Sequence, residues 1–415
     1  MPPIRFIHAA DLHLDAAFSG LSRDIPADFA ERLRTATFIA FRRLLDLCER
    51  ESPDFLLLAG DVYNQEDASV SAQLALRDGF RRLESLSIPV FLVHGNHDPL
   101  ASRLRSVRWP GNVTVFGELP DAVPVFRKGE GTPLAIIHGA SPASGRRTEA
   151  CGLHVGLLHA TPGDADGVAR YAPFSQEDLK ASGMDYWALG HIHDRREVCR
   201  EPLAAYPGCT QGLHINEPGE KGCLLVTAEA RPDGGDAVRT SFRPLGPAVW
   251  KTLDMDLGGA ASLDELENRL RTGLDRAAAE VWSGCEMLLV RLRLQGRTEL
   301  DGLLRKGTTC AELADRLRED GSGVPRIWIK DIDVATRPCV ERGALLERED
   351  LLGEVFRLSE AARTASGLQA LREGPLAPLF AHARAGKALE PLTDEELARL
   401  LDDAESLCLD LLEND

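Results

Sequence analysis

Residues 186–197 read "YWALGHIHDRRE", a short, mostly apolar run that ends in a glycine and two histidines. The run at 186–190 is typical of a buried strand. Residues two apart in an extended chain point to the same face, so His191 and His193 can aim both imidazoles at one point. Neutral imidazole is a common ligand of zinc, manganese and iron. Taken alone, the pair fits either a metal site or a surface pair that binds nothing.

The same kind of apolar run recurs through the first 200 residues. Runs at 4–11, 54–61 and 89–98 predict buried strands, and helical periods at 27–50 and 69–86 lie between them. The later runs "LAIIHGAS", "VGLLHAT" and "YWALGHIH" continue the series. Strands that alternate with helices predict a layered α/β fold.

Ionisable and amide side chains follow five of these runs. They are Asp11 and His13, then Asp61, then Asn96, His97 and Asp98, then His159, and finally His191 and His193. In open α/β sheets, ligands bind beyond the carboxyl ends of the strands, so this repeated placement predicts a single site.

The chemistry of this set favours two divalent ions. Carboxylate, imidazole and amide oxygen together suit hard and borderline metals, and two ions about 3.5–4 Å apart can clamp the oxygens of a phosphoryl displacement. Asp61 lies in the middle of the series and is the natural bridging carboxylate. No cysteine stands at the five strand ends, which argues against a structural zinc site.

A family resemblance rests on these motifs: D-x-H at 11–13, G-D at 60–61, G-N-H-D at 95–98, a strand-terminal His, and G-H-x-H at 190–193. The order resembles that of the calcineurin-like metallophosphoesterases. The stretches "FIHAADLHLD", "LAGDVYN" and "LGHIHDRRE" resemble bacterial DNA repair exonucleases of the SbcD and YhaO type, relatives of the meiotic-recombination-eleven nucleases. The match covers residues 4–215. It implies a layered β-sandwich core flanked by helices, followed by a small α+β cap domain and a helical C-terminal tail.

The resemblance also implies a role for each site residue. One metal would be held by Asp11, His13, Asp61 and His193, and the second by Asp61, Asn96, His159 and His191. His97 would face the scissile phosphate as general acid or phosphate stabiliser, oriented by Asp98. Manganese is the expected metal, although the ligands would also accept iron, magnesium or zinc. Asn64 stands where some relatives carry a second active-site histidine, which puts any activity that needs that histidine in doubt.

The implied function is that of a metal-dependent DNA nuclease, a 3′–5′ exonuclease in DNA repair that hydrolyses phosphodiester bonds with two metals. A small-molecule or phosphoprotein phosphoesterase on the same fold is the alternative enzyme. A metal-free scaffold is the alternative outside enzymes, and the complete ligand set argues against it.

The remaining histidines and two arginines have less defined expectations. His94 either supports the ligands or packs, His138 has no place in the ligand set, and His154 is expected to pack. His214 lies in a loop that closes over the site in relatives, and His382 is expected at the surface. Arg195 and Arg196 follow the histidine pair and either contact phosphates or form a solvated turn.

The composition of the chain limits its partners. With 415 residues, 44% hydrophobic content and a net charge of −17, the chain is not one that coats nucleic acid through a broad basic surface. DNA contact is therefore expected to be local, metal-assisted or shared with a partner. No apolar run approaches the roughly 20 residues that span a membrane. The lack of a secretory signal and nine scattered cysteines without a C-x-x-C pair predict a cytoplasmic protein.

The predicted domains are 1–245 for the metallophosphoesterase core, 246–340 for the α+β cap and 341–415 for the helical region. Residues 393–412 predict an amphipathic helix that opens with a Thr393–Glu396 capping box. Its apolar stripe comprises Leu397, Leu400, Leu401, Ala404, Leu407, Cys408, Leu411 and Leu412. This stripe either packs on the protein's own cap or docks into a partner, such as the SMC-like ABC ATPase that relatives bind.

Overall fold

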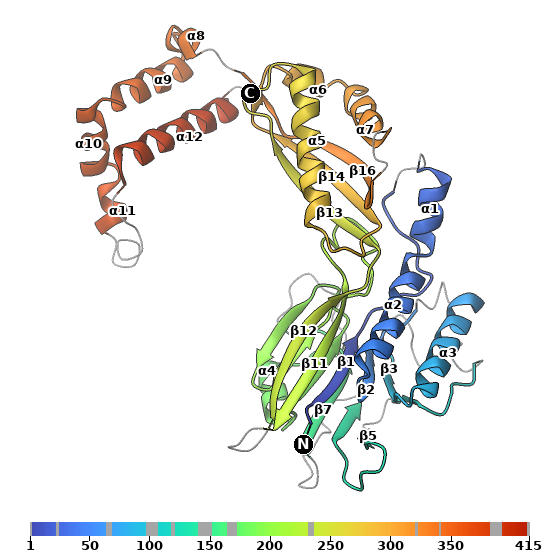
Figure 1. Cartoon of the computed structure of the whole chain (residues 1–415). Coiled ribbons are helices and arrows are strands. Elements are labelled where there is room, and N and C mark those ends of the chain that lie inside the picture. Colours follow the sequence, from blue (N-terminus) through green and yellow to red (C-terminus); the bar gives the residue numbers. More distant parts are fainter. Residues whose placement is uncertain are drawn as a thin grey trace. The chain divides into compact units, whose positions relative to one another are not determined.

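The computed structural model describes most of the chain. The described residues are 2–21, 25–63, 69–96, 107–117, 121–139, 152–163, 172–230, 236–319, 323–339, 342–381 and 392–412. They divide into two compact units: residues 1–296 with 300–336, and residues 297–299 with 337–415. Figure 1 shows the elements of each unit.

Two six-stranded sheets form the core of the first unit. In spatial order, the first sheet contains β12 (Asp236–Pro244), β11 (Gly222–Ala230), β1 (Ile4–Ala9), β2 (Phe55–Ala59), β3 (Val90–Val93) and β4 (Val113–Val115). The second contains β5 (Asp121–Val125), β6 (Ala135–Gly139), β7 (Leu153–His159), β8 (Tyr186–Gly190), β10 (Leu203–Tyr206) and β9 (Arg196–Arg200). Strands β1 to β4 run parallel to one another, as do β6, β7, β8 and β10. Strands β11 and β12 form an antiparallel pair.

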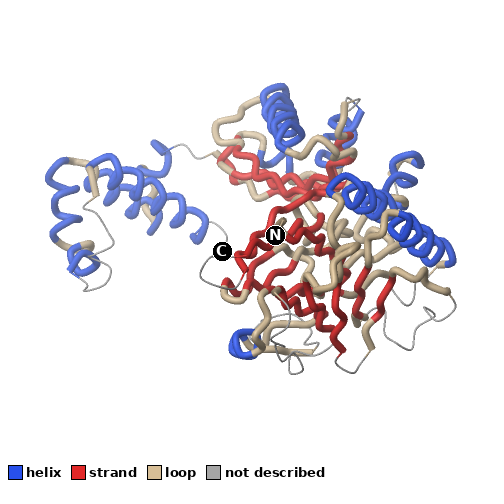
Figure 2. The backbone as a smooth tube through the Cα atoms, turned by 60° about the horizontal axis from the view of Figure 1, so that its bottom comes forward, coloured by secondary structure: helices blue, strands red, loops and turns tan. Residues whose placement is uncertain are grey.

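The two sheets pack face to face, with helices outside them. Phe6, Phe55 and Phe91 of the first sheet share a buried cluster with Leu157 and Tyr186 of the second. Successive residues of a strand point to opposite faces, so the alternate positions of the first sheet pack instead against α2 (Ala36–Glu51) and α3 (Val70–Ser85). The short helix α4 (Gln176–Ala181) covers the outer face of the second sheet. Figure 2 shows strands in the interior of this unit and helices at its surface. The layered α/β prediction is confirmed.

The helical period predicted at 27–50 is two helices rather than one. Helix α1 (Ala27–Arg34) ends at Thr35, and α2 begins at the next residue. The Thr35 hydroxyl donates to the carbonyls of Glu31 and Arg32, so it competes for acceptors that a continuous helix uses. Helix α4 begins with a reciprocal Ser175–Asp178 capping box.

The region predicted as the cap has a sheet of three parallel strands. They are β13 (Ala248–Asp256), β14 (Met287–Gln295) and β16 (Arg326–Val334). Parallel neighbours need crossover connections, which contain α5 (Leu263–Glu280), α6 (Asp301–Leu304) and α7 (Thr309–Glu319). These helices cover one face of the sheet. Phe29 and Leu33 of α1 pack on the other face with Trp250 and Trp328, so the cap sheet and the core share a buried cluster.

The second unit contains a short strand pair and helices. The pair is β15 (Arg297–Thr298) with β17 (Arg337–Pro338). The helices are α8 (Arg342–Leu346), α9 (Leu351–Ala362), α10 (Ala365–Glu373), α11 (Ala377–Ala381) and α12 (Asp394–Leu412). Leu345, Leu352, Phe356 and Leu409 form its buried cluster. Across the ranges that the structure describes, none of the helices has the length and hydropathy needed to cross a membrane.

Candidate metal centre

Five parallel strands end at the same place and deliver the predicted side chains. Asp11 and His13 follow β1, Asp61 follows β2 and Asn96 follows β3 in the first sheet. In the second sheet His159 is the last residue of β7, and His191 and His193 follow β8. The site therefore lies at the carboxyl ends of both sheets, where the sequence predicted it. All seven predicted ligands fall within the described residues.

The backbone leaves each strand abruptly at these residues. Asp11, His13, Asp61 and His191 all have positive φ angles, of 51°, 42°, 47° and 103°. Non-glycine residues rarely adopt this region, and such strain costs on the order of 1–3 kcal/mol per residue and clusters at functional sites. The backbone amides of Asp11 and His13 donate to the carbonyls of Gly60 and Asp61, which holds the first two turns against each other.

Two motif glycines permit this close approach. A Cβ on Gly95 would lie 2.1 Å from Oδ1 of Asp61, so the backbone at Gly95 passes directly over that carboxylate. A Cβ on Gly60 would lie 2.4 Å from Nδ1 of His159, and Gly60 has a φ of 86°. Any larger residue at either position would displace a predicted ligand.

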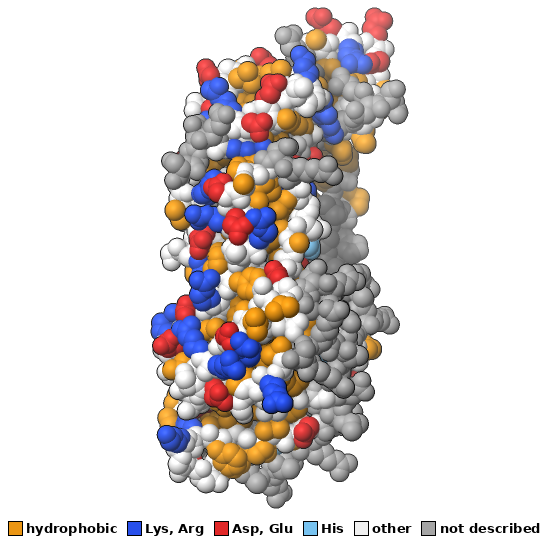
Figure 3. Space-filling model, turned by 90° about the vertical axis from the view of Figure 1, so that its right-hand side faces the viewer, with side chains coloured by type: hydrophobic (Ala, Val, Ile, Leu, Met, Phe, Trp, Pro, Cys, Tyr) orange, Lys and Arg blue, Asp and Glu red, His pale blue; other side chains and the backbone are white. Residues whose placement is uncertain are grey.

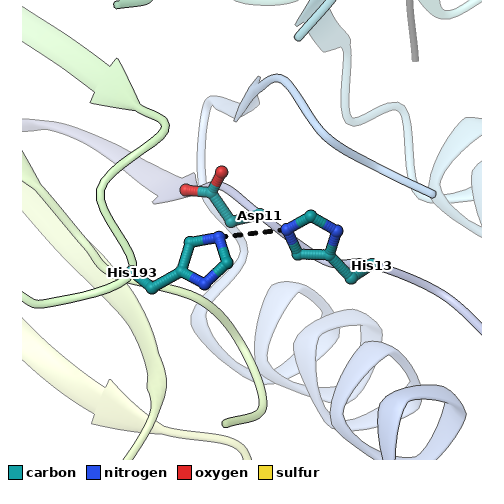
Figure 4. A group of neighbouring side chains, drawn as sticks. All are labelled: Asp11, His13 and His193. Carbon is teal, nitrogen blue, oxygen red and sulfur yellow. Dashed lines mark hydrogen bonds between the residues drawn. The ribbon is translucent and has the colours of Figure 1, made fainter. Parts of the chain in front are cut away.

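The first group of ligand atoms comprises those of Asp11, His13 and His193. One ligand atom from each lies within 4.8 Å of the others. The Nε2 atoms of His13 and His193 are 3.1 Å apart, and Figure 4 shows the two rings facing each other with the Asp11 carboxylate beside them. Asp11 is fully buried, and both its oxygens accept from the backbone N–H of His191 at 3.1 Å.

The second group comprises Asp61, His159 and His191, with Asn96 beside them. Oδ1 of Asn96 lies 3.0 Å from Nε2 of His159 and 2.9 Å from Nδ1 of His191. Nε2 of His159 also lies 3.3 Å from Oδ2 of Asp61. Asp61 and His159 are almost fully buried, whereas Asn96 is exposed and lies on the solvent side of the group.

The orientation of two imidazoles supports metal binding. Nδ1 of His159 donates to the carbonyl of Ala59 at 2.8 Å, and Nδ1 of His193 donates to Oε1 of Glu217 at 2.5 Å. Each ring therefore presents a lone pair on Nε2 to the site, which is the usual arrangement for a metal-binding histidine. Lone pairs of a carboxylate and two imidazoles converge in each group, with an amide oxygen beside the second, and only a cation or added protons can satisfy them together. The residues therefore fit two divalent ions, and the bridging role of Asp61 stays a prediction.

The pKa values reflect this crowding. Burial raises the pKa of Asp11 to about 6, although the charges of His159 and His193 oppose the rise. Burial alone lowers the pKa of His159, but its hydrogen bond to Asp61 and the charges of Asp11 and Asp61 raise it to about 9 overall. The carboxylates therefore draw a proton onto His159 at neutral pH. A divalent cation bound by the same atoms would replace that proton.

Glu217 is a site residue that the sequence did not predict. Its side chain is almost buried, and its other oxygen accepts from the backbone N–H of Leu213 at 2.6 Å. Burial favours its neutral form, but the hydrogen bond and charge of His193 lower its pKa to about 2, so it is a carboxylate. Glu217 lies in the loop "GLHINEPGE", in which the sequence indicated only His214. His214 lies beside Glu217, with Nε2 at 3.3 Å from Oε1.

Some of the other predicted residues are outside the described part of the chain, and others are not in the two ligand groups. His97 and Asp98, the predicted catalytic residues, are outside the described residues, as are Asn64 and His382. His138 and His154 pair with each other at 3.0 Å in β6 and β7, away from the ligand groups, and His154 is buried as expected. His94 directly follows β3 and is half-buried. Arg195 and Arg196 are exposed and contact the aromatic rings of Phe242 and Tyr206.

The chain is similar to several known proteins. Residues 4–195 match the model of the family described as calcineurin-like phosphoesterase, and residues 250–337 match that of the metallophosphoesterase YhaO middle domain. The uncharacterized metallophosphoesterase YhaO of Bacillus subtilis is 34% identical over 90% of this chain and 91% of its own. The DNA double-strand break repair protein Mre11 of Aeropyrum pernix is 27% identical over 68% of this chain and 69% of its own. A solved dimetal phosphatase from Danio rerio covers 58% of this chain and 99% of its own, at 14% identity and a TM-score of 0.34.

The match to YhaO settles the family, since it is 34% identical and covers 90% of this chain. The five strand ends that carry the ligand groups all lie within the part that matches the phosphoesterase model. The chain therefore belongs to the calcineurin-like metallophosphoesterases, enzymes that hydrolyse phosphoesters.

Proposed function

We propose that this metallophosphoesterase is a DNA nuclease that removes nucleotides from 3′ ends in DNA repair. The observation that carries the proposal is the convergence of two ligand groups from five strand ends, which suits a two-metal phosphodiesterase. The similarity to Mre11 repair proteins over two thirds of the chain supports DNA as the substrate. Manganese is the proposed metal.

Two divalent ions bound in these groups would stabilise the charge that develops on the phosphoryl oxygens. The protein's own contribution is to hold the ligands in place. Ala59 and Glu217 fix the tautomers of His159 and His193, and the buried carboxylates of Asp11 and Asp61 supply negative charge. His97 is proposed to assist the departing oxygen, with Asp98 orienting it.

The charge distribution supports local rather than extended DNA contact. The chain has a net charge of −17, and on the face in Figure 3 basic side chains lie among acidic ones. Phosphate contacts are therefore expected close to the metal ligands, or on a partner.

Hydrolysis of labelled DNA tests the proposal. The full chain, purified and loaded with Mn²⁺, is incubated with a duplex labelled at the 5′ end, with a duplex labelled at the 3′ end and with p-nitrophenyl phosphate. Stepwise shortening of the 5′-labelled strand supports the 3′–5′ exonuclease. Hydrolysis of p-nitrophenyl phosphate without cleavage of either duplex would instead show a small-molecule phosphoesterase and overturn the proposal.

A further inference from the structure

A cavity of about 430 Å³ lies at one edge of the two-sheet core. It is lined by Arg195, Arg196, Glu197, Ala205, Tyr206, Leu224, Thr240 and Phe242. Arg195 directly precedes β9, and the other lining residues come from β9 and β10 at the edge of the second sheet and from β11 and β12 at the edge of the first. The cavity therefore bridges the edges of the two sheets, and the ligand groups do not include its lining residues.

Two arginines in this lining are held by aromatic rings. The guanidinium carbon of Arg195 lies 4.0 Å from the ring centroid of Phe242, and that of Arg196 lies 5.4 Å from that of Tyr206. Tyr206 is fully buried, and Phe242 packs against the cluster between the sheets, so both rings are fixed. A guanidinium stacked on a fixed ring loses conformational freedom but keeps its N–H donors available for an anion.

Two observations place the cavity close to the metal ligands. One is the short stretch of chain that joins it to them, and the other is a hydrogen bond. Arg195 is two residues after His193, and two residues span at most about 7 Å. The Tyr206 hydroxyl donates to the carbonyl of Ala160 at 2.7 Å, and Ala160 directly follows His159. Successive phosphates of a strand are separated by roughly 3.4 Å of axial rise in B-form DNA. A strand held at the ligand groups can therefore extend a neighbouring phosphate to these arginines.

We propose that this cavity is a subsite for a phosphate of the substrate strand next to the one that is cleaved. The inference rests on the proposed function and names the part of the DNA that the site recognises. Arg195 and Arg196 contact that phosphate, and Glu197 supplies an acceptor for an N–H group of a base. A strand offers both groups beyond the scissile phosphate, whereas a phosphoserine side chain offers one phosphate and no nucleoside. These features favour nucleic acid over phosphoprotein.

Competition against a small substrate tests the subsite with the full, Mn²⁺-loaded chain. Tetrathymidylate is titrated as an inhibitor of bis(p-nitrophenyl) phosphate hydrolysis, and its inhibition constant is measured over a series of KCl concentrations. The variants are Arg195→Gln and Arg196→Gln. Arg200→Gln is the matched control, because it removes the same charge at the other end of β9, outside this cavity.

Each of the two variants is expected to weaken inhibition by about tenfold, the size of one charged hydrogen bond. Each should also reduce the slope of log inhibition constant against log salt by about 0.7, the value for one phosphate contact on a single strand. Arg200→Gln should change neither quantity by a comparable amount. Equal effects of all three variants would overturn the subsite.

Two further results separate the related hypotheses. If a phosphoserine peptide inhibits with the same dependence on Arg195 and Arg196, the assignment to nucleic acid is wrong. If tetrathymidylate inhibits with that dependence but the wild-type chain cleaves no DNA, the subsite stands and the nuclease proposal fails.

Discussion

At the scale of single residues, Asp61 has the most crowded position in the site. Its carboxylate lies 3.3 Å from Nε2 of His159, its backbone has a positive φ, and Gly95 passes directly over it. A side chain held in this way on a strained backbone indicates a function in binding rather than in stability.

Replacing this carboxylate should remove the metals. We expect Asp61→Ala to lose both ions, or to retain less than one tenth of wild-type phosphodiesterase activity, because the predicted bridge belongs to both metals. Metal content per chain, measured by plasma mass spectrometry, checks this. Asp78→Ala on α3, where Asp78 forms only exposed ion pairs, is the control. Two ions bound to Asp61→Ala with wild-type affinity would show that the ligand assignment is wrong.

The position of Glu217 leads to a separate prediction, because Glu217 contacts a predicted ligand without belonging to either of the two ligand groups. Glu217→Gln keeps the size of the side chain but removes the charge that orients His193. We expect metal affinity to fall by about 10–100-fold, the usual effect of losing a carboxylate that supports a histidine ligand. Titration against a fluorescent chelator measures this without any assay of activity. Glu220→Gln in the same loop is the control, since Glu220 contacts Trp282 instead. Equal affinities of the two variants would contradict the role.

The sequence indicated a site at these strand ends because the polar residues follow apolar runs whose ends can be read from hydropathy. The choice of seven ligands among those residues came from the family resemblance. The sequence missed Glu217, which lies 24 residues beyond His193 in a loop without periodicity. It also could not show the positive φ of Asp11 or Asp61, because nothing in these residue types requires that conformation.

At the scale of elements, the strands were predictable but their division into two sheets was not. The buried runs of β1, β2 and β3 resemble those of β7 and β8, and hydropathy does not say which strands pair. The break between α1 and α2 could not be predicted either, since the helical period of the sequence continues through Thr35. Tertiary contacts decide both features: α1 packs on the cap sheet, whereas α2 packs on the core.

The loop between β10 and β11 connects the cap sheet to the metal ligands. The indole N–H of Trp250 in β13 donates to the carbonyl of Gly212 at 3.0 Å, and the N–H of Gly219 donates to the carbonyl of Trp250 at 2.9 Å. Glu217 lies between these two attachment points. The cap strand therefore helps to hold the carboxylate that orients His193.

Strand β1 carries a buried histidine that makes stability depend on pH. His8 accepts from the Tyr186 hydroxyl at 2.8 Å and donates to the carbonyl of Leu189 at 3.2 Å, so it is neutral in the folded chain. Burial lowers its pKa from 6.5 to about 3, despite the opposing hydrogen bond to Leu189. The unfolded chain takes up a proton below pH 6.5 but the folded chain does not. The stability contributed by His8 is therefore complete above pH 6.5 and is lost as pH falls toward 3.

We expect this loss to reach about 1.4 kcal/mol for each pH unit below 6.5. His8→Gln cannot titrate in this range, so its urea midpoint should lie below that of the wild type at pH 7.5 and approach it by pH 4.5. Urea unfolding of both proteins in EDTA, at a series of pH values, measures the difference. If the difference between the two urea midpoints stays constant with pH, His8 is charged in the folded chain or does not make the stability depend on pH.

At the scale of the whole molecule, packing within the helical unit buries one part of the predicted apolar stripe of α12 and leaves another part exposed. Leu397 is buried and Leu401 and Cys408 are half-buried, and α12 packs on α9. Leu400, Leu407 and Leu411 are 45%, 59% and 64% exposed, although they have helical spacing along one side of α12. Packing within its own unit therefore accounts for only part of the stripe.

We propose that the exposed side of α12 docks into an SMC-like ABC ATPase, which would supply basic surface that this acidic chain lacks. Leu400→Glu and Leu407→Glu should each weaken co-purification with that ATPase by tenfold or more, because a docked helix buries such side chains in apolar surroundings. Metal content and phosphodiesterase activity should be unchanged. Leu263→Glu on α5 is the control, since Leu263 is 52% exposed in the other unit. Co-purification of both α12 variants at the wild-type level would show that the exposed leucines do not form the docking surface. Loss of metal content in the same variants would show that they disturb the fold instead.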